Sequence, residues 1–270
     1  MNYLVKSIKE YKFATLLLCA ITLVSFVSKV LNLNYNSPFN DEAIYVVVGK
    51  LGIFQWDWAT YNADAWMAGL PYIYPTLTAI AYTSFGIIGS RILNIIFGIL
   101  TLEVIFIIAF LLSTTNTRYK IWAGIISASL LGGSAVNFYV SRLATYDMPS
   151  FYFLFSSIAL FLLALKDAKN TPKLFFLSFI SLILGFGSKI TVGMFIPPIL
   201  VISYFASKSD QEKLKSWKLY FFFPTLIVLG LYMVFNIGNL FTFYGAQSAR
   251  ENANIGEIFN VFWENTTYIW

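Results

Sequence analysis

The sequence predicts an all-α polytopic membrane protein, and three observations carry this prediction. Of the 270 residues, 58% are hydrophobic and 19% aromatic, while only 11% are charged; soluble domains carry about 25% charged residues. The mean hydropathy is +0.71. Apolar runs long enough to cross about 30 Å of hydrocarbon recur between short charged loops. Because open sheet edges cannot be satisfied in lipid, helices are the expected spanning elements.

Composition also excludes several kinds of site. The chain has no histidine and one cysteine, Cys19, so it holds no intrachain disulfide, no zinc site of the Cys/His type and no histidine catalysis. Proton transfer is left to Asp, Glu, Lys or Tyr. The net charge of +5 comes from basic residues scattered through short loops. This pattern forms no continuous basic patch and argues against nucleic-acid binding.

Eight apolar runs set the order of the elements. The first follows Lys6, Lys9 and Lys12; it is too long for a signal-peptide core and lacks a small-residue cleavage site, so we interpret it as a retained helix. The runs lie at about 13–33, 71–85, 90–112, 121–140, 150–165, 174–188, 191–206 and 219–236.

The run 71–85 is short and contains Pro75, so it either crosses the membrane or lies in the interface. If it does not cross, 12 of the 18 basic residues fall on the cytoplasmic side; if it crosses, only 7 do. The positive-inside rule therefore favours the interfacial interpretation. It predicts seven spanning helices, a cytoplasmic N-terminus, an outer loop 34–89 with juxtamembrane helices, and an outer tail 237–270.

We expect residues 1–270 to form a single transmembrane domain, the N-terminal part of a longer protein. The predicted topology gathers six ionisable residues at one membrane boundary, where charge is costly unless it is paired or lines a cavity. Each also has a simpler explanation: capping of a helix, snorkelling at the interface, mutual pairing of Arg142 with Asp147, or anchoring of a helix end. The six are Asp41, Glu42, Arg91, Arg142, Asp147 and Lys189.

Residues 40–45 (NDEAIY), followed by the aromatic run 54–58, resemble the first outer loop of GT-C glycosyltransferases. The resemblance is closest to the group of protein O-mannosyltransferases and lipid A aminoarabinose transferases. It continues in order at 71–77, 90–94, 141–149 and 185–189. One departure is 67–70 (MAGL), where many aminoarabinose transferases carry a charged pair.

The resemblance implies a GT-C-type transmembrane helix bundle in the plasma membrane. Such enzymes move a sugar from a polyprenyl-phosphate (dolichyl-phosphate) donor to an acceptor hydroxyl on a lipid, glycan or protein, at the outer face and with inversion. It implies that Asp41 is the base, that Glu42 orients neighbouring groups and that Asp147 shapes the site. The donor phosphate would be bound by Arg91, Lys189 and Arg142.

No cofactor is required by this scheme. Carboxylate oxygens suit magnesium or manganese, so a divalent metal held by Asp41 and Asp147 is an open alternative. The partners are the donor, the acceptor and membrane lipids. Two other classes remain open: a transporter or flippase of lipid-linked substrates, and a structural membrane subunit. Convergence of the charged residues around one outer cavity favours the enzyme, and scatter over the surface argues against it.

Overall fold

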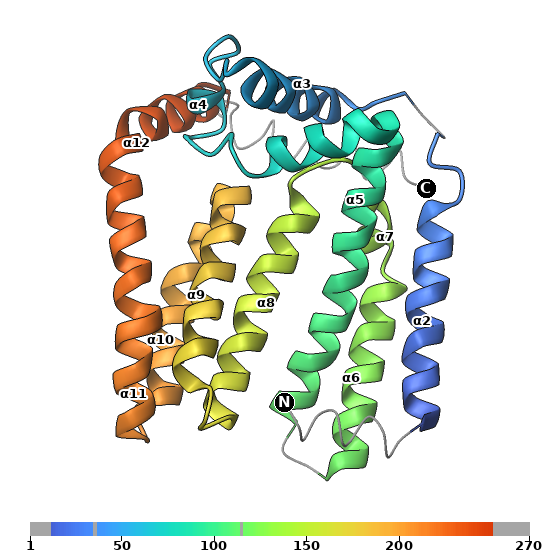
Figure 1. Ribbon diagram of the computed structural model, residues 1–270, viewed down its shortest axis with the longest axis vertical. Coiled ribbons are helices and arrows are strands. Elements are labelled where there is room, and N and C mark those ends of the chain that lie inside the picture. The colour runs from blue at the N-terminus through green and yellow to red at the C-terminus, as the bar shows by residue number, and fades with distance from the viewer. Residues whose placement is uncertain (1–11, 35–36, 114–115, 251–270) are drawn as a thin grey trace, which may run out of the picture.

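The computed structural model describes residues 12–34, 37–113 and 116–250, with the side chains of Tyr244 and of 246–250 left aside. Over these ranges the chain forms helices and no strand. Long helices stand side by side as a bundle, while α3, α4 and the first part of α5 lie across one end of it (Figure 1). We call this the α3 end. The architecture is the predicted all-α polytopic membrane fold.

The bundle is built from helices whose lengths match a bilayer. Six helices among the described residues are long and apolar enough to span, and the pair α6–α7, bent by 63°, makes a seventh if it is counted as one span. The helices are α2 (Lys12–Val30), α3 (Asn40–Gln55), α4 (Ala63–Trp66), α5 (Tyr74–Leu112), α6 (Thr117–Gly132), α7 (Ala135–Ser141), α8 (Asp147–Lys166), α9 (Thr171–Ser188), η1 (Ile190–Phe195), α10 (Ile196–Ser207), α11 (Gln211–Trp217), η2 (Lys218–Phe222) and α12 (Phe223–Arg250).

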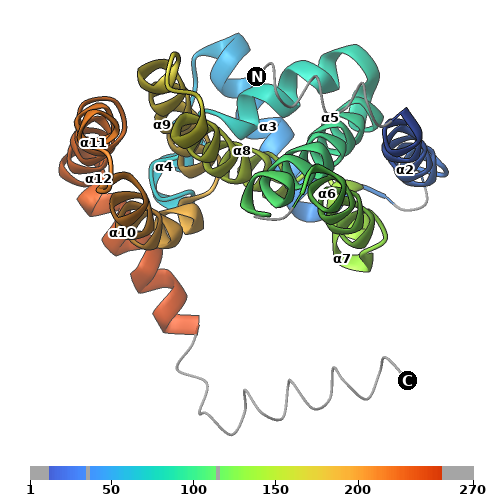
Figure 2. The ribbon, with the colours of Figure 1, turned by 90° about the horizontal axis from the view of Figure 1, so that it is seen from below.

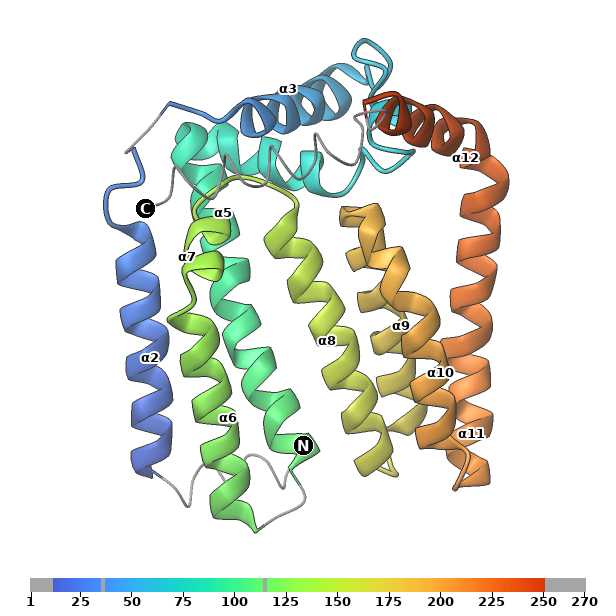
Figure 3. The same cartoon turned by 180° about the vertical axis from the view of Figure 1, so that it is seen from behind.

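Helix α5 is broken near its first third. Phe85 (φ −141°, ψ 21°) and Gly86 (φ 60°, ψ −153°) leave helical geometry, and the positive φ of Gly86 is readily adopted only without a Cβ. Residues before the break run across the α3 end, and residues after it run down the bundle (Figures 1 and 3). The segment 71–85 therefore lies across the end of the bundle, which is the arrangement that the charge distribution favoured.

Small and hydroxylated residues bring the long helices together, as is common where lipid offers no hydrophobic drive for association. Ser178 Oγ of α9 donates to the carbonyl of Ser157 in α8 at 2.7 Å. A Cβ on Gly98 would lie 2.4 Å from Ser141 Oγ, and one on Gly124 would lie 2.6 Å from the Phe106 ring. Seen along the bundle, α2 and α12 lie at opposite edges (Figure 2).

The last helix differs from the expectation. The prediction ended the final span at 236 and began a tail at 237, but α12 continues to Arg250 and bends over at the α3 end (Figure 1). There it meets the segment after α4: Tyr232 donates its hydroxyl to the Ala68 carbonyl. Residues 251–270 of the predicted tail, and Lys6 and Lys9 before the first helix, lie outside the described ranges.

Candidate active site

The site is built around the start of α3. Phe39 is extended (φ −65°, ψ 150°), and its N–H donates to Glu42 Oε2 at 2.8 Å. A carboxylate in the first helical turn also complements the positive end of the helix dipole. Glu42 thus closes the helix start. The alternative in which Asp41 caps the helix is wrong, because Asp41 lies within the first turn, where it borders a cavity.

Glu42 forms a buried ion pair with Arg91 of α5. Both side chains are fully buried; Arg91 Nε donates to Oε1 at 2.9 Å and Nη2 to Oε2 at 2.7 Å. The Ala144 N–H donates to Oε1 at 2.7 Å, and Arg91 Nη1 donates to the Leu33 carbonyl. A bidentate pair with its remaining groups hydrogen-bonded is the form in which buried charge is tolerated.

The electrostatics of Glu42 follow from these contacts. Burial alone would raise the pKa of its carboxyl, but the hydrogen bonds from Arg91, Ala144 and Phe39 outweigh burial and hold the pKa below its ordinary value. The pair joins the end of α2, the start of α3, the spanning part of α5 and the loop before α8. It therefore fixes the direction in which the first turn of α3 presents its neighbour, Asp41.

This geometry revises the predicted role of Arg91 in binding the donor phosphate. Neither Glu42 nor Arg91 lines the cavity, and the Arg91 guanidinium has no exposed surface for a phosphate to reach. The alternative of Arg91 as a snorkelling interfacial residue is wrong for the same reason. Asn94, one turn along α5, extends the framework by donating to the carbonyls of Leu143 (2.5 Å) and Thr145 (2.6 Å).

Beneath α3 lies a cavity of about 300 Å³. Its lining mixes aromatic and apolar side chains with a few polar ones, which is the usual make-up of a small-ligand site. The polar groups come from the first turn of α3 and from the junction of α9 with η1. The lining residues are Asp41, Tyr45, Trp66, Met67, Leu70, Tyr146, Ser188, Lys189, Ile190, Thr191 and Phe243.

Lys189 is the cation of this cavity. It sits where α9 ends and η1 begins, in extended geometry (φ −149°, ψ 122°), and forms an ion pair with Asp147 in which the side chains are 28% and 27% exposed. Its Nζ also lies 4.9 Å from the centre of the Tyr146 ring. Thr145 donates its hydroxyl to the other Asp147 oxygen at 2.9 Å. Asp147 therefore acts on the cavity through Lys189.

Arg142 points elsewhere. Its Nη2 donates to the carbonyls of Leu31 (2.9 Å) and Asn32 (2.8 Å) at the end of α2, and it is not among the residues lining the cavity. The alternative in which Arg142 and Asp147 pair with each other is wrong, because Asp147 pairs with Lys189; binding of the donor phosphate by Arg142 stays a prediction.

The aromatic side chains of the cavity do not supply a base, and Asp41 is the carboxylate among its described lining residues. Tyr45 packs against Tyr146, Tyr74 and Trp66, with ring centres 4.9, 5.4 and 5.9 Å apart. Burial, followed by the proximity of Tyr146, raises the pKa of Tyr45 far above its ordinary value, so Tyr45 stays protonated and does not serve as a base. Among the residues lining the cavity, Asp41 is the one carboxylate.

A metal finds a poor ligand set here. Among the described residues, no three Asp, Glu, Cys or His side chains gather. One oxygen of Asp147 is bound to Lys189 and the other accepts from Thr145. Both oxygens of Asp147 are therefore engaged by protein groups, and a metal held by Asp41 and Asp147 stays a prediction.

Several lining residues were not singled out from the sequence. Tyr146, Ser188 and Thr191 flank residues that were chosen, so adjacency to Asp147 and Lys189 was the available signal. Trp66 is different: the aromatic residues Trp56, Trp58, Tyr61 and Trp66 suit either stacking on a sugar or anchoring at the interface, and the sequence favours anchoring. Trp66 meets Tyr45 at the cavity, while Trp56 of the same stretch is 87% exposed.

Comparison with protein families finds a match for most of the bundle. A family model described as dolichyl-phosphate-mannose-protein mannosyltransferase covers residues 71–236, more than half of the chain. Arg91, Arg142, Asp147 and Lys189 lie inside the matched range, and Asp41 and Glu42 precede it. A search of the curated proteins and one of the solved structures found no match.

Proposed function

Since the chain belongs to the dolichyl-phosphate-mannose-protein mannosyltransferase family, we propose that its cavity transfers a sugar from a polyprenyl-phosphate donor to an acceptor hydroxyl. The family makes the protein a multi-pass membrane glycosyltransferase of the mannosyltransferase type. The observation that carries the finer proposal is the meeting of Asp41 and Lys189, one anion and one cation, in a single aromatic-lined cavity at one end of the bundle.

In the proposed reaction, the acceptor oxygen forms a bond to the anomeric carbon while the bond from that carbon to the phosphate oxygen breaks. The proton of the acceptor hydroxyl passes to Asp41, because a base must lie within hydrogen-bond reach of the attacking group. The electron pair of the broken bond leaves with the polyprenyl phosphate. Attack from the face opposite the phosphate inverts the anomeric configuration.

Lys189 is the proposed partner of the leaving phosphate. A cation placed where negative charge develops stabilises the transition state most strongly in a partly dehydrated site. Lys189 is partly exposed to the cavity, unlike Arg91, which is engaged with Glu42. A lysine is a compact point charge on a flexible stem, so it can move from Asp147 to an arriving phosphate. Asp147 then holds Lys189 in position in the empty site.

Glu42 and Arg91 are positioning residues in this scheme, and no step passes through a metal. The sugar would lie against the rings of Trp66 and Tyr45. Both rings line the cavity; Trp66 is 43% exposed, whereas Tyr45 is buried behind it.

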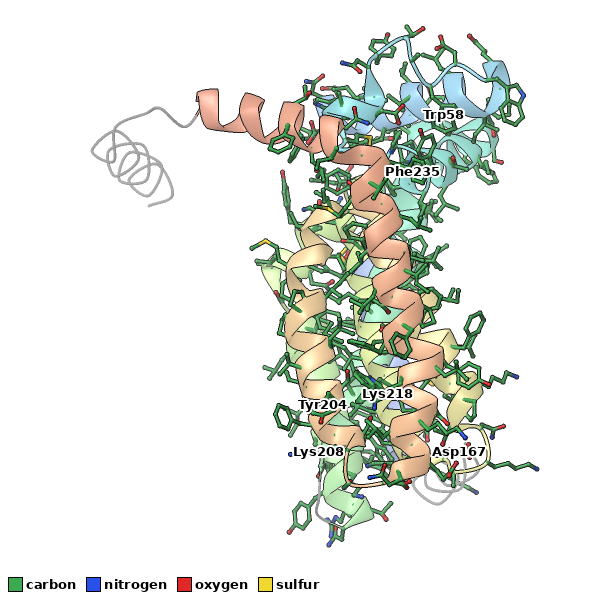
Figure 4. All side chains as sticks on the ribbon, turned by 90° about the vertical axis from the view of Figure 1, so that its left-hand side faces the viewer. Trp58, Asp167, Tyr204, Lys208, Lys218 and Phe235 are labelled. Atoms are coloured by element: carbon green, nitrogen blue, oxygen red, sulfur yellow. The ribbon has the colours of Figure 1, made fainter. Side chains whose placement is uncertain are left out.

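The outer face of the plasma membrane is the proposed location of the α3 end. Trp58 lies at that end, whereas Lys208 and Asp167 lie at the opposite end (Figure 4). Most of the basic residues in the described loops are also at the opposite end, in 118–120, 166–173 and 208–218. Short basic loops favour the cytoplasmic side. This assignment exposes the cavity to acceptors outside the cell.

The test uses the full-length protein in liposomes with a polyprenyl-phosphate mannose donor, and measures cleavage of the sugar–phosphate bond as well as transfer. Asp41→Asn should lower the rate by about 10² to 10⁴-fold. The matched control is Asp57→Asn, in the loop after α3, where the carboxylate accepts N–H groups of Ala59 and Thr60 outside the cavity. Full activity in Asp41→Asn removes Asp41 as the base. Donor crossing the bilayer uncleaved identifies a flippase instead.

A further inference from the structure

A second groove lies at the end of the bundle opposite the catalytic cavity. It is about 530 Å³ in volume and runs between α10 and the chain that returns through η2 into α12. Leu200, Tyr204 and Phe205 form one wall, and Phe222 and Phe223 form the other. Tyr204, Phe205 and Phe223 are 41%, 57% and 52% exposed, so the groove opens sideways at the surface of the bundle.

The returning helix is irregular at this groove. Residues Lys218–Phe222 form a π-helical turn, in which the Phe223 N–H donates to the carbonyl of Lys218, five residues back. Such turns insert one extra residue into a helix and are often found at functional sites. The wider turn accompanies a lysine in an otherwise apolar wall: Lys218 lines the groove beside Phe222 and Phe223.

The floor of the groove is fixed. Trp217 is buried, and its indole Nε1–H donates to Ser203 Oγ of α10 at 2.9 Å. The same ring stacks on Phe222, with centres 5.0 Å apart. The two walls are therefore held together from beneath, and the groove is formed before anything occupies it.

Two cations accompany the groove: Lys218 lines it, and Lys208 lies beside the wall residue Phe205. Lys208 follows the last turn of α10, and its Nζ lies 4.5 Å from the centre of the Phe205 ring, which is itself part of the wall. Figure 4 shows Lys208, Lys218 and Tyr204 toward the same end of two neighbouring helices. Lys213 is different, because it pairs with Asp210 at 3.3 Å. Among the described residues, neither Lys208 nor Lys218 has an ion pair with a carboxylate.

We propose that this groove binds an anionic phospholipid of the bilayer, with an acyl chain along the aromatic walls and the phosphate between Lys208 and Lys218. Basic residues beside an apolar groove between spanning helices match the two parts of such a lipid. A soluble anion would gain nothing from the walls. A second copy of the chain on a two-fold axis would bring the same lysines together, and like charges oppose that contact.

The experiment places the full-length protein in nanodiscs of equal phosphatidylglycerol and phosphatidylcholine, and measures the ratio of the two lipids retained per protein by native mass spectrometry. The variant Lys208→Gln/Lys218→Gln removes both cations. Since each basic residue near an anionic lipid contributes several-fold to binding, the preference for phosphatidylglycerol should fall roughly thirty-fold. The matched control, Lys169→Gln/Lys173→Gln, removes two exposed charges from the α8–α9 region at the same end.

Val201→Trp is the second variant, because Val201 lines the groove, is 56% exposed and can be enlarged without touching the buried Trp217. Filling the groove should displace the retained lipid while both lysines remain. A wild type without a preference, or an equal loss in the control, overturns the proposal in favour of diffuse surface charge. A changed oligomeric state in Val201→Trp with unchanged lipid retention overturns it in favour of a second copy.

Discussion

Breaking the Glu42–Arg91 pair should unfold the α3 end before the rest of the bundle. Glu42 accepts four hydrogen bonds, two from Arg91 and one each from Ala144 and Phe39. Glu42→Gln strands the guanidinium without a counter-charge and turns an amide NH₂ toward donors. Removing one member of a buried pair costs about 3–5 kcal/mol. Arg91→Met should cost less, because two of the four hydrogen bonds to the carboxylate survive.

The measurement is the apparent unfolding temperature, followed by fluorescence of the seven tryptophans. With about 2–4 °C per kcal/mol for a chain of 150–250 residues, Glu42→Gln should lower it by roughly 6–20 °C. The double variant Glu42→Gln/Arg91→Met leaves no buried charge without a partner. Its loss of unfolding free energy should therefore be about 2 kcal/mol smaller than the sum of the losses in the two single variants.

The matched control for these variants of the buried pair is Lys213→Gln, which removes the partly exposed ion pair with Asp210. Exposed pairs contribute about 0–1 kcal/mol, so its unfolding temperature should stay within a few degrees of the wild type. Single variants at Glu42 and Arg91 that unfold like Lys213→Gln, or a strictly additive double variant, refute the reasoning.

Three further outcomes are expected. The folded pKa of Glu42 lies below its ordinary 4.5. The stability contributed by the pair is therefore complete above pH 4.5 and is lost as the pH falls through the folded pKa. On acidification, the unfolding temperature should fall less in Glu42→Gln than in the wild type. Lys189→Gln should lower kcat about 10² to 10³-fold, with partial recovery in Lys189→Arg, and equal rates in both variants contradict a phosphate role. Gly49→Ala should destabilise by about 1–3 kcal/mol, because its Cβ would lie 1.9 Å from the Pro75 carbonyl oxygen, whereas Gly230→Ala, with nothing within 4 Å, should be neutral in the same thermal assay.

The spanning helices could be predicted because bilayer thickness sets a length that apolar runs must meet. The position of 71–85 could be inferred because one crossing more or fewer moves every later basic loop to the other side. The extension of α12 to Arg250 could not. Its last turns bend at the α3 end and project away from the other helices (Figures 1 and 2), so a hydropathy pattern set by the bilayer does not mark where this helix ends.

The site shows where sequence reasoning stops. Asp41 and Glu42 are adjacent, but a helix turns about 100° per residue, so one borders the cavity and the other is buried against Arg91. Nothing local indicates which is which. The partner of Asp147 is likewise decided by how α8 packs on α9, which brings Lys189 closer than the neighbour in sequence, Arg142. The catalytic role of Asp41 stays a prediction.

The far wall of the catalytic cavity has a consequence for biosynthesis. Phe243 lines the cavity, and Tyr232 and Asn236 of the same helix meet Ala68 and Gly69 in the first long loop. Asp41 therefore precedes α12 in the chain by most of the helices of the bundle, and the cavity is bordered on this side by α12. During translation, which lays down N-terminal segments first, the half-built site stays open on one side. The cavity is therefore bordered on all its described sides only after α12 has packed against the segment that follows α4.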